Sequence, residues 1–217
     1  MVVDLGSGTG LSTRPWAPVA EEVVGVEPNA AMLRQAEAIT PEANVRYVNA
    51  SAYATGLTDG CADLVTASQS LQWMRPERVF PEIARILRPG GVFCAYAYFA
   101  LQTPLWEPEE EFGVVRERTG AIRRERGLVQ ETWPVTAERL EESGVFRLVR
   151  ELALHSVDAG DAERLIGFAL SQGSVSTLLE AGATEEDVGL DRLRATAARM
   201  PEPVPWWISY RVWLGLR

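Results

Sequence analysis

The sequence predicts an α/β protein, in which a doubly wound sheet of seven mostly parallel strands carries helical insertions that form a cap. Three observations predict this class. Short β-branched runs alternate with helical stretches over the first hundred residues, which is typical of a parallel sheet with crossover helices. A glycine-rich turn, residues 6–10, directly follows the first run. Two charged helical segments later interrupt the strand pattern.

The strands are recognised as short runs of β-branched residues or of alternating apolar residues. In chain order we expect them at residues 2–5, 23–27, 45–49, 63–67, 92–96, 146–154 and 204–217.

The helices between these strands have their own signals. Asn29 is a good N-cap for a helix that runs to about residue 38. A second helix begins near Pro76, carries apolar residues at helical spacing and stops at the "RPGG" segment, residues 88–91. Pro15 and Pro18 predict that the first crossover helix is short or irregular. Residues 136–143 read as a further helix.

The changes in pattern predict the domain organisation. Residues 1–99, 136–158 and 201–217 are expected to form the sheet core. Residues 100–135 and 159–200 are expected to be helical insertions over the substrate side of the sheet.

Composition excludes several classes of function. The net charge of −9 disfavours a surface that follows nucleic-acid phosphates. No run of about 18 apolar residues predicts a membrane span, and the first residues do not resemble a secretory signal. Two cysteines, Cys61 and Cys94, fit a reducing, cytoplasmic location. With His155 as the sole histidine, we expect no metal site.

The spacing of the glycines limits the class of ligand that the turn can bind. A dinucleotide fingerprint needs a third glycine at position 11, where the sequence has Leu11. The observed G-x-G-x-G turn follows Asp4, which favours a ligand with an amino group over a pyrophosphate. Glu27 ends the second predicted strand, where a carboxylate accepts hydrogen bonds from ribose hydroxyls.

Four segments, in this order, carry a family resemblance: "VVDLGSGTG", "VVGVEPNAAML", "DLVTASQSLQWM" and "ARILRPGGVFCAYAY". They resemble class I S-adenosylmethionine-dependent methyltransferases of the type 11 group over about residues 1–98, which implies a Rossmann-like methyltransferase fold. The segments "SQSLQWM", "HSVDAGDAERLIGFALSQGSVSTLL" and "WWISYRVWLGLR" resemble, more narrowly, the branch that includes trans-aconitate methyltransferases.

The resemblance implies a cofactor site. The turn would hold the methionine part, Glu27 the ribose, and the residues after the third and fourth strands the adenine edge and the methyl-donor end. Relatives often have an acid followed by alanine after the third strand, where this chain has Ser51 and Ala52. The implied cofactor residues are Asp4, Gly6, Ser7, Gly8, Thr9, Gly10, Glu27, Pro28, Asn29, Ser51, Ala52, Ser68 and Gln69.

The predicted substrate residues are Gln72, Trp73, Tyr96, Tyr98 and Trp106. Relatives commonly have a histidine before the tryptophan, where this chain has Gln72, so the resemblance supplies no histidine base and the catalytic residues stay unknown. A carboxylate acceptor needs no deprotonation at neutral pH. We therefore expect methyl transfer from S-adenosylmethionine to a small molecule, with S-adenosylhomocysteine as the product. The absence of an identified base favours a carboxylate as the acceptor.

Two other functions stay open. Family members usually have a few dozen residues before the first strand, and these form helices over the cofactor, whereas Met1 here lies directly at the strand. We expect a partner subunit to cover the cofactor cleft in a homodimer. The same feature supports a degenerate, non-catalytic methyltransferase-like protein. An NAD-binding oxidoreductase is the weaker alternative.

Overall fold

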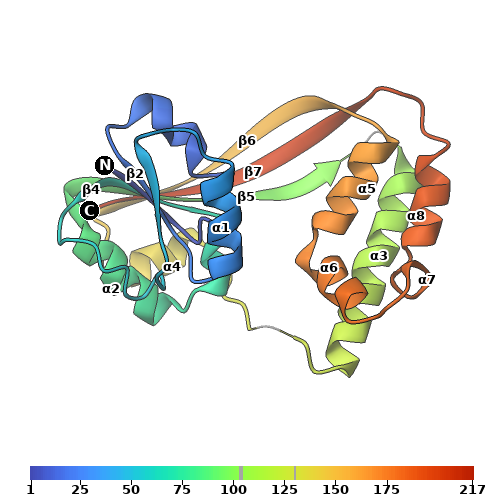
Figure 1. Cartoon of the computed structure of the whole chain (residues 1–217), viewed down its shortest axis with the longest axis horizontal. Coiled ribbons are helices and arrows are strands. Elements are labelled where there is room, and N and C mark those ends of the chain that lie inside the picture. Colours follow the sequence, from blue (N-terminus) through green and yellow to red (C-terminus); the bar gives the residue numbers. More distant parts are fainter. Residues whose placement is uncertain (103–104, 130) are drawn as a thin grey trace. The chain divides into compact units, whose positions relative to one another are not determined.

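The computed structural model describes residues 1–102, 105–129 and 131–217, with the side chains of all these except 99–102. In the described residues seven strands form one sheet with the order β3-β2-β1-β4-β5-β7-β6 (Figure 1). The predicted α/β class and the mostly parallel seven-stranded sheet are confirmed. The strands are β1 (Val2–Leu5), β2 (Val23–Val26), β3 (Val45–Val48), β4 (Ala62–Ser68), β5 (Leu87–Gln102), β6 (Leu148–Gly160) and β7 (Val204–Leu216).

The helices follow the expected order. Asn29 caps α1, since its Oδ1 accepts hydrogen bonds from the backbone N–H groups of Ala31 and Met32. The segment that contains Pro15 and Pro18 is a short 3-10 helix, as predicted. The helices are η1 (Arg14–Val19), α1 (Ala30–Ala38), η2 (Leu71–Trp73), α2 (Pro76–Ile86), α3 (Trp106–Glu125), α4 (Ala137–Glu142), α5 (Ala162–Ser171), α6 (Gly173–Glu180), α7 (Glu185–Val188) and α8 (Leu190–Ala197).

The sheet reverses its winding between β1 and β4. β1 pairs in parallel with both β2 and β4, and β3 and β5 extend the sheet outward, also in parallel. Hydrogen bonds join Gly90 and Gly91, near the start of β5, to Arg217, which follows β7. β7 is therefore antiparallel to β5. The carboxyl ends of β1 and β4 diverge at a topological switch point, where ligands bind in open α/β sheets.

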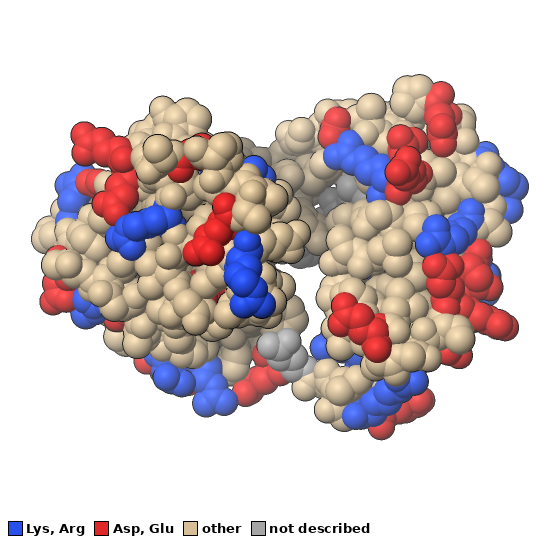
Figure 2. All heavy atoms as spheres, in the orientation of Figure 1, with Lys and Arg blue, Asp and Glu red and all other residues tan. Residues whose placement is uncertain are grey.

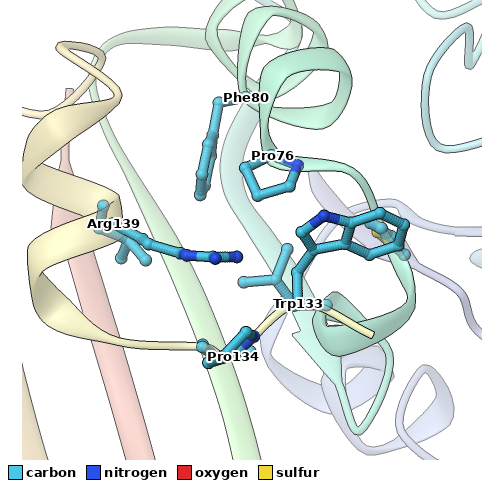
Figure 3. Close-up of a pocket in the computed structure, with 9 residues that line it drawn as sticks. Pro76, Phe80, Trp133, Pro134 and Arg139 are labelled. Atoms are coloured by element: carbon cyan, nitrogen blue, oxygen red, sulfur yellow. The ribbon is translucent and has the colours of Figure 1, made fainter. Parts of the chain in front are cut away.

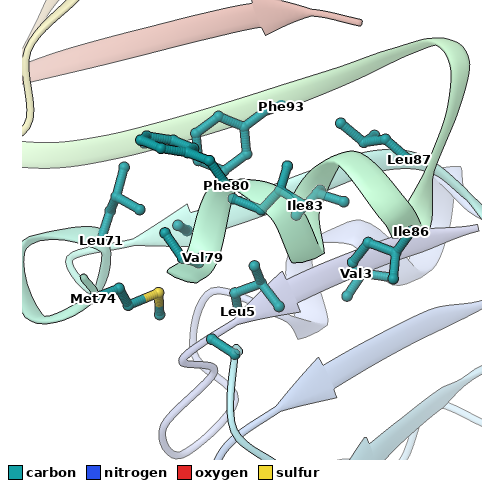
Figure 4. Close-up of a cluster of buried hydrophobic side chains, with 14 of the residues drawn as sticks. Val3, Leu5, Leu71, Met74, Val79, Phe80, Ile83, Ile86, Leu87 and Phe93 are labelled. Carbon is teal, nitrogen blue, oxygen red and sulfur yellow. The ribbon is translucent and has the colours of Figure 1, made fainter. Parts of the chain in front are cut away.

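One face of the sheet is buried under α2 (Figure 4), and Leu140 of α4 belongs to the same apolar cluster. The apolar residues of α2 recur at helical spacing, so Val79, Ile83 and Ile86 all point at the sheet and are fully buried. On the sheet side the same cluster contains Val3, Leu5, Val65, Ala67 and Phe93. Because side chains alternate along a strand, Asp4 and Thr66 lie on the opposite face.

The chain divides into two compact units. Unit 1 comprises Met1–Tyr98, Glu131–Leu154 and Tyr210–Arg217, and unit 2 comprises Phe99–Gln130 and His155–Ser209. In unit 2, α3 and α5–α8 enclose a second apolar cluster that includes Val115, Leu178, Leu193 and Trp206. Figure 2 shows acidic and basic side chains mixed over the visible face. Among the described residues, no helix combines the length and apolar character needed to span a bilayer.

Several predicted strand limits are wrong. β5 was expected at residues 92–96 but begins at Leu87, because the "RPGG" segment lies inside the strand, where the pairing with β4 shifts register between Ala62 and Leu64. β6 was expected to end at residue 154 but extends to Gly160, so the first two residues of the predicted insertion 159–200 are strand. Long-range pairing extends both strands beyond their local apolar runs.

Candidate functional site

The turn at residues 6–10 is fastened to the neighbouring strand. The backbone N–H groups of Gly6 and Ser7 both donate to the Val26 carbonyl, at 2.8 and 3.2 Å. Gly8 and Gly10 have left-handed φ values of +54° and +82°. A Cβ at Gly8 would meet no atom within 4 Å, whereas a Cβ at Gly10 would overlap the Tyr47 hydroxyl. The turn is therefore packed at Gly10 and open at Gly8.

Glu27 directs its carboxylate at the open part of this turn. Its Oε2 accepts a hydrogen bond from the Gly8 backbone N–H at 3.2 Å, and its Oε1 accepts one from the Asn29 N–H at 2.9 Å. The residue is 8% exposed. Each oxygen of an ionised carboxylate has two lone-pair sites, so each retains one after these bonds. The geometry leaves Glu27 able to accept two further hydrogen bonds beside Gly8.

Asp4 lies on the inner side of the turn. It is completely buried, and its Oδ2 accepts hydrogen bonds from the Ser12 and Thr13 hydroxyls, each at 2.7 Å. The Thr66 hydroxyl donates to Oδ1 at 2.8 Å. Burial raises the pKa of Asp4, and the three hydroxyls partly offset that effect. In the structure Asp4 orders the segment after the turn, and its contact with a ligand stays a prediction.

The residues predicted to surround an adenine follow β2 and β3. Pro28 and Asn29 are exposed, and the Asn29 side chain is engaged as the α1 cap. The Ser51 Oγ accepts a hydrogen bond from the Tyr53 N–H at 3.3 Å, and Ala52 is buried. Asn49 joins the two segments, because its side-chain amide donates to the carbonyls of residues 27 and 28. The structure thus brings the two predicted adenine segments together.

The end of β4 has a strained backbone. Gln69 has a φ of +52°, which is uncommon for a residue with a side chain. Its N–H donates to the Tyr96 carbonyl at 2.9 Å, and the next residue, Ser70, donates its hydroxyl to the Leu5 carbonyl at 2.6 Å. These bonds tie the loop after β4 to β5 and to the base of the glycine turn. Strain held in this way is found most often at functional sites.

The short helix η2, which carries Gln72 and Trp73, is braced by the segment before α4. The Trp133 N–H donates to the Gln72 carbonyl at 2.9 Å, and Arg75 lies over the Trp133 ring. Figure 3 shows Trp133 and Pro134 opposite Pro76, with the Arg139 side chain pointing into the hollow between them. Trp73 itself is 42% exposed, so it is not a core residue.

The remaining predicted residues are spread over two places. Tyr96 lies directly opposite Ser68 in the sheet register, and Tyr98 follows it as an exposed residue. Ser7 is buried and Thr9 half-buried within the glycine turn. Trp106 begins α3 in unit 2 and is 71% exposed. The predicted cofactor residues therefore gather in unit 1 at the carboxyl ends of β1 to β4, and Trp106 belongs to the other unit.

Residues 3–95 match the family model described as a methyltransferase domain. These residues form a methyltransferase domain, as the resemblance to class I S-adenosylmethionine-dependent methyltransferases implies. The family resemblance read from the sequence is thereby confirmed, and the match covers the strands and turns that form the candidate site.

Relatives of this methyltransferase domain match over the same part of the chain. The uncharacterized methyltransferase Rv3342 of Mycobacterium tuberculosis (strain H37Rv) is 39% identical over 90 residues, which are 42% of this chain and 36% of that protein. Trans-aconitate 2-methyltransferase of Azoarcus sp. (strain BH72) is 36% identical over 124 residues, 55% of this chain and 45% of that protein. Malonyl-[acyl-carrier protein] O-methyltransferase of Pectobacterium atrosepticum is 35% identical over 100 residues, 46% of this chain and 38% of that protein. The matched segments thus span less than half of these relatives.

Solved structures extend the likeness of the methyltransferase fold to the whole chain. A candidate type II methyltransferase from Anaeromyxobacter dehalogenans superposes with a TM-score of 0.68 at 24% identity, over 99% of this chain and 88% of that one. At this identity the likeness concerns the fold.

Sequence reasoning missed several residues around the candidate site. The hydroxyls of Ser12, Thr13 and Thr66 enclose Asp4, and Tyr47 supports Gly10 from β3. The hydroxyl residues are common in any sequence, and only their position around a buried acid distinguishes them, so no local signal could have identified them.

Proposed function

We propose that the chain transfers a methyl group from S-adenosylmethionine to the carboxylate of a small molecule, which yields a methyl ester and S-adenosylhomocysteine. One observation carries the proposal. The Glu27 carboxylate accepts a hydrogen bond from the Gly8 N–H, and a Cβ built on Gly8 would meet no atom of the protein within 4 Å. The match of residues 3–95 to the methyltransferase-domain model and the trans-aconitate and malonyl-[acyl-carrier protein] relatives support it.

The residues present fit this cofactor. The free lone pairs of Glu27 suit the two adjacent hydroxyls of a ribose, which need two acceptors close together. The open space at Gly8 lets a ligand approach the main chain without a steric clash. A dinucleotide fingerprint has glycine at position 11, where this chain has Leu11. The Leu11 side chain is 70% exposed, and it does not give a ligand the close access to the main chain that glycine gives.

Bound S-adenosylmethionine would supply a methyl group already activated on a sulfonium. The protein then has to hold the acceptor in line with that methyl group and exclude water from it. We assign the positioning at the methyl-donor end to Ser68 and Gln69, since the bonds around Gln69 fix their backbone. The insertions at 100–135 and 159–200, which contain Trp106, are proposed to contribute to the acceptor side.

A carboxylate acceptor is favoured because it is ionised at neutral pH and needs no base. Tyr96, which pairs with Ser68 in the sheet, stays protonated at neutral pH, because burial raises its pKa above the ordinary value of 10.0. A phenol or ammonium acceptor would need a proton acceptor there.

Titration calorimetry separates the candidate functions. We expect S-adenosylmethionine and S-adenosylhomocysteine to bind and NAD not to bind. Binding of NAD alone would support an oxidoreductase, and binding of none of the three would support a degenerate protein. A Glu27→Gln variant gives the matched control, since it keeps the size of the side chain and removes its charge.

Mass spectrometry tests the acceptor class. With trans-aconitate as the probe, we expect a product heavier by one methylene group that alkaline hydrolysis returns to the acid. The corresponding triamide, in which all three carboxylates are replaced and no carboxylate nucleophile remains, should not react. Equal methylation of acid and amide would contradict a carboxylate acceptor.

Two finer predictions also stay proposals. A homodimer is supported by Leu148, Leu152 and Leu154 of β6, which are 42, 44 and 54% exposed on one face of the strand. A molar mass in solution equal to one chain at all concentrations would exclude it. A cytoplasmic location is supported by the free thiols of Cys61 and Cys94.

A further inference from the structure

Two residues of α2 hold the loop that follows β3. The Glu82 Oε1 atom accepts hydrogen bonds from the Thr55 backbone N–H at 2.7 Å and from the Thr55 hydroxyl at 2.6 Å. Arg85 donates from a terminal guanidinium nitrogen to the Leu57 carbonyl, also at 2.6 Å. Thr55 and Glu82 are both buried. The loop is therefore attached to the helix at two positions, residues 55 and 57.

The two α2 residues also bind each other. Arg85 donates to both oxygens of Glu82, from its Nε and from a terminal nitrogen, each at 2.8 Å. The Oε1 atom thus accepts three hydrogen bonds, two from Thr55 and one from Arg85. Hydrogen bonds to a charged group are stronger than those between neutral groups. Arg85 therefore orients the carboxylate that receives both bonds from Thr55.

The helix that carries this pair is anchored on the sheet. Val79, Ile83 and Ile86 of α2 are fully buried in the apolar cluster beneath it. At the N-terminal end of the helix, the Arg75 backbone N–H donates to the Tyr53 hydroxyl at 2.9 Å. Because the helix is packed in this way, its polar contacts fix the loop relative to the sheet.

The loop residues held by α2 adjoin the segment that is predicted to lie beside adenine. Ser51 and Ala54 form a closed turn, since the Ala54 N–H donates to the Ser51 carbonyl at 3.0 Å. Ala54 directly precedes Thr55. Before the turn, the Asn49 side chain donates to the carbonyls of residues 27 and 28. The turn is thus held between the candidate ribose site and α2.

We propose that Glu82 and Arg85 are positioning residues for the base of the bound nucleoside, and that they set its preference for adenine by fixing the turn at residues 51–54. This inference rests on the proposed function. Adenine presents an amine donor beside a ring-nitrogen acceptor, whereas hypoxanthine presents a carbonyl acceptor beside an N–H donor. Hydrogen-bonding groups in fixed positions therefore favour one base over the other, and a turn that can shift discriminates less.

Two ligands that differ only in the base test the inference. S-adenosylhomocysteine contains adenine and S-inosylhomocysteine contains hypoxanthine, and calorimetry measures both affinities. We expect the unaltered chain to prefer the adenine ligand by about 10-fold or more. Glu82→Gln keeps the size of the side chain and should weaken S-adenosylhomocysteine by about 10-fold, with a change of less than about 3-fold for S-inosylhomocysteine. The preference for adenine should thereby fall toward equality.

A matched pair of variants at Thr55 separates positioning from a general loss of stability. Thr55→Val keeps the shape of the side chain but removes the hydroxyl that donates to Glu82, and it should weaken S-adenosylhomocysteine by about 5-fold. Thr55→Ser retains the hydroxyl and should keep the affinity and the base preference of the unaltered chain. Arg88→Gln removes an exposed ion pair with Asp63, which includes no residue of 51–57, and should change neither affinity.

The outcomes that overturn the inference differ from those that overturn the function. If the unaltered chain binds neither ligand, the proposed function fails, and this inference fails with it. If the unaltered chain binds both ligands equally, or if Glu82→Gln and Thr55→Val change neither affinity, the inference alone fails. Equal weakening of the two ligands, or an equal loss in Thr55→Val and Thr55→Ser, would also overturn it, since the effect would then not depend on the base or on the hydroxyl.

Discussion

The two sides of the glycine turn each have an acid and a glycine, but only on one side are these residues enclosed by other protein groups. On the inner side, Asp4 is fully buried among three hydroxyls, and Gly10 lies against the Tyr47 hydroxyl. On the outer side, Glu27 accepts two backbone N–H groups and keeps lone pairs free, and Gly8 faces open space. The inner side is satisfied by the protein itself, whereas the outer side is left for a ligand.

This difference shows that residue type alone does not reveal a role. Asp4 and Glu27 are both acids at the carboxyl ends of adjacent parallel strands. Three side-chain hydroxyls satisfy Asp4, and two backbone N–H groups satisfy Glu27, which leaves a different number of acceptor sites on each. Four substitutions test the comparison, in order of decreasing effect.

Gly10→Ala should lower the free energy of unfolding by about 3 kcal/mol, because a new Cβ overlaps the Tyr47 hydroxyl and the left-handed φ disfavours alanine. Urea denaturation measures the loss. Gly8→Ala is the matched control, at about 1 kcal/mol, since only the backbone term applies.

The overlap with Tyr47 has its own test. A Tyr47→Phe change in the Gly10→Ala background should restore about 1 kcal/mol, since it removes the overlapping oxygen. Gly8→Ala should instead weaken S-adenosylhomocysteine, because its Cβ enters the ligand side. Equal losses of stability in the two alanine variants would remove the distinction between the packed and open parts of the turn.

Glu27→Gln should weaken S-adenosylhomocysteine by about 100-fold, because the amide cannot accept two hydroxyl donors as a charged carboxylate does. Calorimetry measures the affinity. Affinity for 5′-methylthioadenosine, which contains the same ribose, should fall by a similar factor. An unchanged affinity for both would show that the outer side is not the ribose site.

Glu82 of α2 is a buried carboxylate that is not among the predicted site residues. It accepts hydrogen bonds from Thr55 and pairs with Arg85 at 2.8 Å, and these partners, Arg85 above all, lower its pKa from 4.5 to about 2. The pair therefore stabilises the fold fully above pH 4.5, and this stabilisation is lost as the pH falls toward 2.

Glu82→Gln should cost about 1–2 kcal/mol at pH 7, a value reduced because Arg85 is one-third exposed to water. Urea denaturation between pH 6 and pH 2.5 measures the free energy of unfolding. As the pH falls, this free energy should decrease less in the variant than in the unaltered chain, because the variant has no Glu82 carboxylate to protonate. Glu77→Gln, an exposed change on the same helix, should retain the full decrease. A full loss of S-adenosylhomocysteine binding in folded Glu82→Gln, instead of a loss of about 10-fold, would show that this network serves more of the site than the base.

Asp4→Asn should have the smallest effect, within about 1 kcal/mol in unfolding free energy. Burial makes the charged form costly, and the surrounding hydroxyls can each rotate to accept from the amide. S-adenosylhomocysteine affinity should change less than 10-fold. A loss as large as that of Glu27→Gln would place Asp4 on the ligand side and support its predicted contact with the methionine amino group.

Much of the site was predictable because its signals are local. A buried strand followed by alternating glycines predicts the turn, and Glu27 follows the second strand directly. The helix cap at Asn29 also depends on neighbours two and three residues away. Tyr47 was not predictable, since it meets Gly10 from another strand of the sheet.

The sequence by itself determined the order of the elements, the open turn and the positions of the two acids, because strand periodicity and glycine conformation act over a few residues. Only the tertiary structure decided which acid is enclosed and which remains free to bind. A strand pattern specifies the face toward which a side chain points, but what it meets there depends on residues distant in the chain. The two carboxylates therefore differ in their partners: Asp4 accepts a hydrogen bond from the Thr66 hydroxyl, and Glu27 accepts one from the Gly8 N–H.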